Sequence, residues 1–171
     1  MDAAAEKAFR SFAAARLPAL LRFAHLLTGN PTAAEDLVQS ALTRTALSWS
    51  RVRRHDNPEA YVRQTMLNLQ RNVWRGRPWR VAPTAEPPET IDSHCAEDEY
   101  DDRDLMWRAL GTLPPRQRAV LVLRYYSDLS EAEIADALGC SRGTVKSQAA
   151  KALAKLRVLT AFTDSDQEVR P

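Results

Sequence analysis

The stretch "SEAEIADALGCSRGTVKSQAAKALAKLR", residues 130–157, decides the fold of the second half of the chain. Ser130 stands three residues before Glu133, the spacing of a capping box, and predicts a helix that begins directly after the serine. Gly139 predicts the end of that helix, because a turn that needs a positive φ favours glycine. Ser141 is suited to cap a second helix almost at once. Two short helices with so tight a turn predict a helix-turn-helix over residues 131–150.

Both predicted helices have an apolar side that would face a common core. In the first helix this side contains Ile134, Ala135 and Leu138, and the small Ala135 lies where the second helix must cross closely. In the second helix the side that should face the core consists of Val145, Ala149, Ala152, Leu153 and Leu156.

The opposite side of the second helix suits a polyanion. Residues 141–157 contain five cations and no acid. A slim strip of Gly143, Ser147, Ala150 and Ala154 lies opposite the core, with Lys146 and Arg157 on one edge and Thr144, Lys151 and Lys155 on the other. A slim face fits the major groove, which is about 12 Å wide, and cations on both edges can reach the two phosphate backbones. We therefore predict DNA binding rather than a solvated surface helix.

The first half of the chain is predicted to form three further helices. The first spans residues 3–27 and ends at "TGNP", where Gly29 suits a helix end and Asn30-Pro31 suits a cap and first helical position. "TAAEDLVQSALTRTALSW" and "NPEAYVRQTMLNLQRNVWRGR" supply the second and third helices. Their expected buried sides are Phe9, Phe12, Leu17, Leu20, Leu21 and Leu27 in the first, Val38, Leu42, Thr45 and Trp49 in the second, and Val62, Met66, Leu69 and Val73 in the third.

The third of these helices has a second, polar row. Gln64, Asn68, Arg71 and Arg75 repeat at helical spacing, and Asn72 lies beside them. Amide and guanidinium groups in one row predict a hydrogen-bonding surface, more selective than a row of lysines. The alternative is an amphipathic helix with an ordinary polar face.

Charge divides the chain into blocks. Residues 51–80 hold eight Arg and two acids (+8 − 2 = +6), and residues 86–104 hold nine acids and one base (+1 − 9 = −8). The segment 77–103, which holds most of these acids, contains four prolines and few aliphatic residues, so it predicts a linker that cannot order itself. We expect domains at 1–76 and 104–159, a linker at 77–103 and a disordered tail at 160–171.

Several classes of protein find no support in the sequence. No signal peptide, membrane span, metal-ligand spacing, Gly-rich phosphate loop or nucleophile with a partner is present. Both cysteines are expected to be free thiols in a reducing cytoplasm. We expect no enzyme activity, cofactor, metal, small-molecule substrate or membrane insertion.

Two separate parts of the chain resemble one family. "LGTLPPRQRAVLVLRYYSDLSEAEIADALGCSRGTVKSQAAKALAKLR" resembles region four of the extracytoplasmic-function sigma factors, and "AEDLVQSALTRTALSW" with "NPEAYVRQTMLNLQRNVWR" resembles their region two. The chain most resembles the SigE-like subgroup of actinobacteria. The resemblance implies an all-α protein with two small helical domains, region two and region four, joined by a flexible acidic linker.

The resemblance also implies a function, a dissociable RNA polymerase subunit that directs the core enzyme to promoters. The partners it implies are promoter DNA, the β′ clamp and β flap of core polymerase, and an anti-sigma factor. Region two would dock on the β′ clamp and hold a base flipped from the opened minus-ten element, while region four reads the minus-thirty-five element. The implied residues are Asp36, Leu37, Gln39 and Leu42 for the clamp; His55, Asp56, Asn57, Asn68, Arg71, Asn72 and Arg75 for the minus-ten element; and Ser141, Arg142, Thr144, Lys146, Ser147, Lys151 and Lys155 for the minus-thirty-five element.

The chain departs from many relatives in the second helix of the helix-turn-helix. Many relatives carry Arg where this chain has Gln148, and a bulkier pair in place of Ala149-Ala150, which leaves the base sequence open. Tyr61 and Trp74 suit either base stacking or the core, and we favour the core. The alternative function is a free-standing helix-turn-helix regulator of LuxR-like type, although residues 1–75 lack the pattern of a receiver domain.

Overall fold

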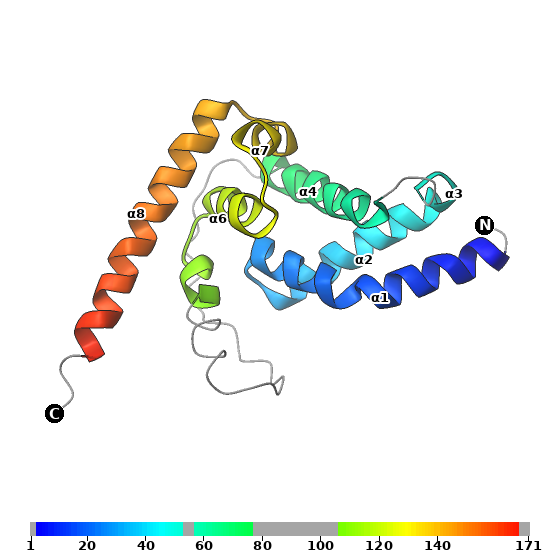
Figure 1. Ribbon diagram of the computed structural model, residues 1–171, viewed down its shortest axis with the longest axis horizontal. Helices are drawn as coiled ribbons and strands as arrows, with labels where there is room; N and C mark the ends of the chain where they lie inside the picture. The colour runs from blue at the N-terminus through cyan, green and yellow to red at the C-terminus, as the bar shows by residue number, and fades with distance from the viewer. Residues whose placement is uncertain (1–2, 53–56, 77–105, 168–171) are drawn as a thin grey trace. The chain divides into compact units, whose positions relative to one another are not determined.

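The computed structural model describes residues 3–52, 57–76 and 106–167, with side chains placed up to Val158 in the last helix (Figure 1). Every regular element in these ranges is helical, which confirms the predicted all-α class. Contacts divide the chain into two compact units, Met1–Arg80 and Val81–Pro171. The predicted linker at 77–103 lies outside the described residues.

The first unit consists of α1 (Ala3–Thr28), α2 (Pro31–Leu47), α3 (Trp49–Val52) and α4 (Pro58–Gly76). Gly29 ends α1 with a φ of 68°. Asn30 then caps α2, because its Oδ1 accepts a hydrogen bond from the Ala33 amide at 2.9 Å, and Pro31 occupies the first turn. The predicted "TGNP" boundary is confirmed. α2 packs against both α1 and α4.

The core of the first unit lies between these three helices. Its largest fully buried side chains are those of Leu20, Phe23, Leu27, Val38, Val62 and Met66. The prediction that Leu17 and Val73 lie in the core is wrong, because Leu17 is 40% exposed and Val73 is 52% exposed. Residues 14–18 of α1 are exposed all round, so no neighbouring element covers Leu17. Val73 lies near the end of α4, whereas Leu67 of the same helix is buried although it was not predicted to be.

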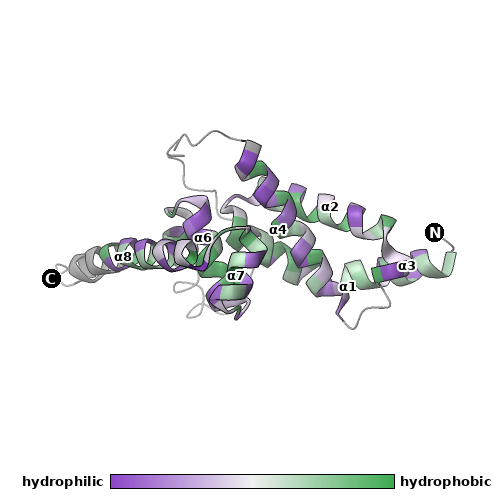
Figure 2. Ribbon diagram, turned by 90° about the horizontal axis from the view of Figure 1, so that it is seen from above, coloured by the Kyte–Doolittle hydropathy of each residue, from purple (hydrophilic) through white to green (hydrophobic). Residues whose placement is uncertain are grey.

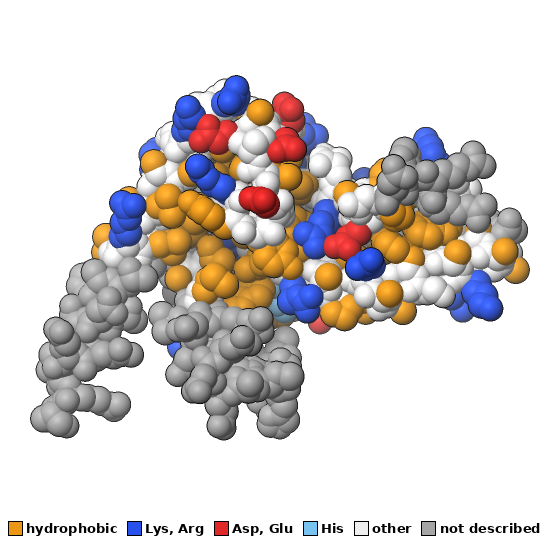
Figure 3. Space-filling view, in the orientation of Figure 1, with side chains coloured by type: hydrophobic (Ala, Val, Ile, Leu, Met, Phe, Trp, Pro, Cys, Tyr) orange, Lys and Arg blue, Asp and Glu red, His pale blue; other side chains and the backbone are white. Residues whose placement is uncertain are grey.

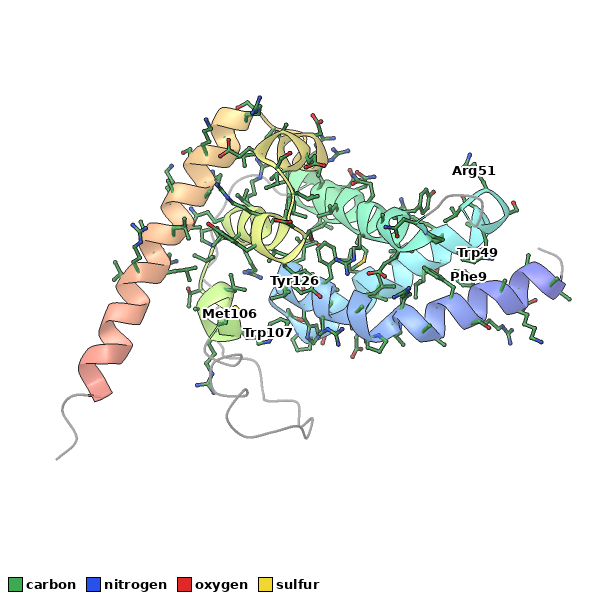
Figure 4. All side chains as sticks on the ribbon, in the orientation of Figure 1. Phe9, Trp49, Arg51, Met106, Trp107 and Tyr126 are labelled. Atoms are coloured by element: carbon green, nitrogen blue, oxygen red, sulfur yellow. The ribbon has the colours of Figure 1, made fainter. Side chains whose placement is uncertain are left out.

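An aromatic cluster fixes the N-terminal part of α1 to α3. Trp49 is 4% exposed, and its ring centroid lies 5.3 Å from that of Phe9 and 5.1 Å from that of Phe12 (Figure 4). Tyr61 of α4 packs against the same cluster, so its side chain belongs to the core, as favoured from the sequence. Such aromatic contacts bury large areas and stabilise one arrangement of the rings.

The second unit begins with helical backbone at 106–111 and continues with α6 (Pro115–Leu121) and the π-helix η1 (Val122–Tyr126). Arg118 of α6 is only 6% exposed. Its Nε donates to the carbonyl of Leu110 at 3.0 Å and its Nη2 to that of Leu113 at 2.9 Å. The side chain thus supplies donors to carbonyls at the end of the preceding helical segment, while burial lowers the pKa of Arg118.

The helix-turn-helix forms as predicted. The Ser130 Oγ accepts from the Glu133 amide at 3.3 Å and the Ser130 amide donates to Glu133 Oε2 at 2.9 Å, completing the capping box of α7 (Glu131–Leu138). The Ser130 hydroxyl also donates to Glu133 Oε2 at 2.6 Å, and this bond first and the bond from the Ser130 amide second lower the pKa of Glu133. Gly139 has a φ of 64°, the left-handed turn that its position predicts.

The last helix, α8 (Arg142–Gln167), is longer than the sequence suggests. A disordered tail was predicted from residue 160, but the helical backbone continues through Gln167, and residues 168–171 of this tail lie outside the described residues. Residues 158–167 contain no proline or glycine that would end the helix, which favours its continuation. The prediction of disorder relied instead on the low apolar content of the tail.

Asp128, between η1 and α7, has a φ of 54°, and no other non-glycine residue in the described ranges has a positive φ. We predict that Asp128→Val lowers the local free energy of unfolding by about 1–2 kcal/mol, because a β-branched side chain is strained in this region. Asp128→Gly should leave it within about 0.5 kcal/mol, since glycine adopts this φ freely. Amide hydrogen exchange of peptides from α6 to α7 measures both. Asp136→Val, in the regular part of α7, is the control, and equal losses in the two valine variants would contradict the prediction.

Candidate nucleic-acid interface

The predicted two sides of α8 are confirmed by burial. Val145, Ala149 and Ala152 are at most 3% exposed, and Leu153 and Leu156 pack half-buried against the core. Hydrophilic and hydrophobic residues accordingly alternate along α8 (Figure 2). The small residues on the opposite side are all exposed: Gly143, Ser147, Ala150 and Ala154.

The fold leaves room for a side chain at position 143, where the chain has glycine. A Cβ placed on it would meet only the Ser141 Oγ, at 3.8 Å, which is ordinary van der Waals contact. Its φ is not in the left-handed region, so alanine would fit the backbone and suit a helix better. Packing and backbone conformation therefore do not require glycine at this position.

The first turn of α8 is closed by its own hydroxyl groups. The Ser141 Oγ accepts from the Thr144 amide at 3.1 Å and lies 2.9 Å from the Thr144 Oγ1. Ser141 therefore serves as the helix cap that its position predicts. Arg142, the first residue of the helix, is exposed, and its side chain has no hydrogen bond or ion pair within the described residues.

The cations of α8 differ from one another in their contacts. Cationic side chains gather over its N-terminal half in Figure 3. Lys151 is exposed, and nothing in the described part of the chain binds its ammonium group. Lys146 lies 3.7 Å from Glu131 of α7. Lys155 donates to the carbonyl of Thr112 at 2.7 Å, a contact across 43 residues that ties α8 to the end of the 106–111 segment.

In α4, the polar row predicted from the sequence is only partly open to solvent. Asn72 and Arg75 are exposed, whereas Asn68 is half-buried and lies 3.5 Å from the Gln64 amide. Arg71 is half-buried, and its Nε has no hydrogen-bond partner among the described residues.

The loop before α4 contributes one described residue. Asn57 caps α4, because its Oδ1 accepts from the Ala60 amide at 3.0 Å, so its side chain is already engaged. His55 and Asp56 lie outside the described residues. Trp74 is half-buried, and its buried Nε1 has no partner among the described residues.

The four residues predicted to dock on a partner lie on α2 but do not share one surface. Asp36 and Gln39 are exposed, and Leu42 is half-buried. Leu37 is 7% exposed and belongs to the core of the first unit, which leaves it little surface for a partner.

Sequence reasoning missed two residues of the α8 surroundings. Glu131 and Arg124 come from neighbouring elements and lie 3.6 Å apart. Both look like ordinary surface charges in the sequence, and their proximity to Lys146 depends on the tertiary packing. Glu131 had one available signal, its place in the first turn of a helix that directly precedes α8.

Two further kinds of site, a metal centre and a membrane span, are not found in the described part of the chain. No group of three or more His, Cys, Asp or Glu side chains in these ranges is placed to hold a metal ion. The described helices include none with the length and apolar character needed to cross a bilayer.

Comparison with known proteins identifies both units. Residues 12–80 match the family model for sigma-70 region 2, and residues 103–156 match that for sigma-70 region 4. The RNA polymerase sigma-E factor of Streptomyces coelicolor is 40% identical over 158 residues, covering 92% of this chain and 89% of the relative. The ECF RNA polymerase sigma factor SigL of Mycobacterium tuberculosis is 32% identical over 146 residues, covering 81% of each. Among solved structures, the sigma factor RpoE of Bartonella quintana, in complex with the anti-sigma factor NepR, matches with a TM-score of 0.63 and 26% identity, covering 91% of this chain and 98% of that one.

Lys151 and Lys155 lie one helical turn apart, and variants of the two should have different effects on DNA binding and on stability. We predict that Lys155→Met lowers the free energy of unfolding by about 0.5–1 kcal/mol, because the Thr112 carbonyl loses its donor, and changes duplex-DNA affinity by less than about twofold. Lys151→Met should do the reverse, weakening DNA binding by about threefold or more, as a lost phosphate contact does. Urea denaturation and fluorescence anisotropy on labelled duplex DNA measure the two effects. The same order of effects for both lysines would mean that their environments do not differ in solution.

Proposed function

The chain belongs to the extracytoplasmic-function sigma factors of the sigma-70 family, and from this premise we propose how its two units act at a promoter. As a sigma factor, it is a subunit that directs core RNA polymerase to promoters and promotes initiation. The carrying observation is that both halves match sigma domains, in order. A free-standing regulator would not account for the match over residues 12–80.

In this proposal, α8 of the second unit enters the major groove of the minus-thirty-five element. The exposed small residues would face the base edges, and Arg142, Thr144, Lys146, Ser147 and Lys151 would reach bases and phosphates. Ser141 contributes as the cap of the helix. Lys155 was predicted to join this set, but its bond to Thr112 supports a structural role instead.

The first unit is proposed to bind the minus-ten element and the polymerase. Asn72 and Arg75 of α4 are the exposed groups of the polar row, and Arg71 has an unsatisfied donor that a DNA acceptor would complete. Asn68 lies beside them, whereas Asn57 supports this surface as the cap of α4, next to His55 and Asp56. Asp36 and Gln39 of α2 would contact the β′ clamp, with Leu42 at the margin and Leu37 positioning α2 from the core. The second unit would meet the β flap.

Sigma factors are non-enzymatic regulatory subunits, and we propose that this chain likewise has no catalytic activity of its own. Its place of action would be the cytoplasm, where promoter DNA and core polymerase meet. The Bartonella quintana relative was solved with an anti-sigma factor, and a protein of that kind is the proposed regulator of this chain.

Reconstitution tests the function and the two DNA surfaces together. Core polymerase lacking sigma, a native upstream promoter fragment and the purified chain should yield promoter-dependent transcripts only when all are present. Asn72→Ala and Lys151→Ala should each reduce open-complex formation by about tenfold, because each removes one DNA contact worth roughly 1–3 kcal/mol. Both variants should still bind core. Loss of core binding by either would show that the surface is misassigned, and tight promoter binding without any stimulation of transcription would favour a regulator.

The polymerase surface has its own matched pair of variants. Gln39→Arg should weaken binding to core polymerase by about tenfold or more, since a bulky cation would be placed in the contact. Ser11→Arg adds the same group at an exposed position of α1, outside the proposed contact, and should have less than about a twofold effect. Both positions are exposed, so the fold should tolerate both changes. Binding to labelled core measures the difference, and equal effects would remove Gln39 from the proposed interface.

A further inference from the structure

Glu131 of α7 holds one carboxylate between two cations of different elements. Its Oε2 lies 3.7 Å from the Nζ of Lys146 in α8, and its Oε1 lies 3.6 Å from the Nη1 of Arg124 in η1. Each oxygen therefore faces one cation. The side chain of Glu131 is 24% exposed, compared with 38% for Arg124 and 66% for Lys146. The carboxylate is the most enclosed member of this trio, and Lys146 is the most open.

Both distances exceed those of a direct charge-assisted hydrogen bond, about 2.7–2.9 Å. The two contacts are therefore loose ion pairs, which the cations can leave without breaking a close hydrogen bond. Lys146 stands on the edge of the small-residue strip of α8, so a DNA phosphate approaching this edge would compete with Glu131 for the same ammonium group. A phosphate that reaches Lys146 also approaches the carboxylate and is repelled by it.

We propose that Glu131 restrains phosphate binding by the second unit and so acts as a specificity-determining residue. This inference rests on the DNA-binding face proposed above for α8. Glu131 neutralises Lys146 and Arg124 until DNA displaces it. Attraction to the phosphate backbone of DNA alone then gives only weak binding. Base contacts along the strip decide which duplexes bind more tightly.

The reason lies in the two components of DNA affinity. Attraction to phosphates is independent of sequence and supplies nearly all non-specific binding. Base contacts carry the sequence information. A carboxylate that opposes only the phosphate contribution lowers affinity for every duplex, and it raises the share of the remaining affinity that depends on sequence. Arg124 and Lys146 would otherwise add two cations to the surface beside the recognition helix.

Glu131 also has a simpler role that the test must separate. An acid in the first turn of a helix is favourable with the helix dipole, and Glu131 occupies that turn of α7. Removal of the charge would then affect stability alone. Asp136 supplies the matched control, because it is an exposed acid on the same helix without an ion pair among the described residues.

The experiment measures binding of the full chain to a labelled 20-bp duplex of random sequence by fluorescence anisotropy over a range of salt concentrations. Glu131→Gln should tighten binding by about threefold or more at low salt. The slope of log K against log salt should become steeper by about one unit, because Lys146 then releases a counterion when it meets a phosphate. Asp136→Asn should change affinity by less than about twofold, as expected for an exposed acid that pairs with no cation among the described residues.

A double-mutant cycle with Lys146→Gln completes the test. The gain from Glu131→Gln should disappear in the Lys146→Gln background, and Lys146→Gln should weaken binding less in the native background than beside Gln at position 131. Circular dichroism checks that each variant is folded. Weaker binding in Glu131→Gln, or a gain equal to that of Asp136→Asn, would overturn the inference.

Lys151→Ala separates this inference from the proposed function. If Lys151→Ala weakens duplex binding while Glu131→Gln has no effect, only the role of Glu131 fails. If neither Lys151→Ala nor Lys146→Gln alters duplex binding, the DNA-binding face of α8 itself is misassigned.

Discussion

The second unit depends on the chain reversal at Gly139, because this reversal sets which side of α8 is buried. The Cys140 amide donates to the Ala135 carbonyl at 3.0 Å and the Gly139 amide to that of Asp136 at 3.3 Å, a Schellman pattern that ends α7. This pattern requires the left-handed conformation that Gly139 adopts. With α7 and α8 so joined, Val145 is fully buried, and the small-residue strip is turned to solvent.

The elements around this reversal were predictable because their signals are local. A capping box, a glycine at a left-handed turn and an Asn-Pro pair act within a few residues, so the sequence carries them in full. The buried side of α8 was predictable for a related reason, since helical periodicity places residues on one side before any partner is known. Candidate DNA residues such as Lys151 follow from the same geometry, and their solvent exposure agrees with it.

The contacts that escaped prediction join residues through tertiary packing. The bond from Lys155 to Thr112 spans 43 residues, and the Arg118 side chain reaches back to the carbonyls of Leu110 and Leu113. The partner of a long, flexible side chain cannot be predicted from helical periodicity, because the bound carbonyl comes from another element. The prediction that Leu17 lies in the core was wrong for the converse reason, because whether an apolar residue is covered depends on where the neighbouring helices lie.

These contacts reduce the number of cations on α8 that are available to a partner. The sequence counts five cations without an acid from 141 to 157, yet Lys146 faces a carboxylate of α7 and Lys155 is bound to a backbone carbonyl. The number of charges on a helix is therefore an upper bound on the phosphates it can hold. Arg142 and Lys151 lie at the end and the middle of the exposed strip, and their side chains are not engaged within the described residues. In the proposed complex, the unengaged cations Arg142 and Lys151 would position the strip on the phosphate backbone, and base contacts along the strip would supply the sequence information.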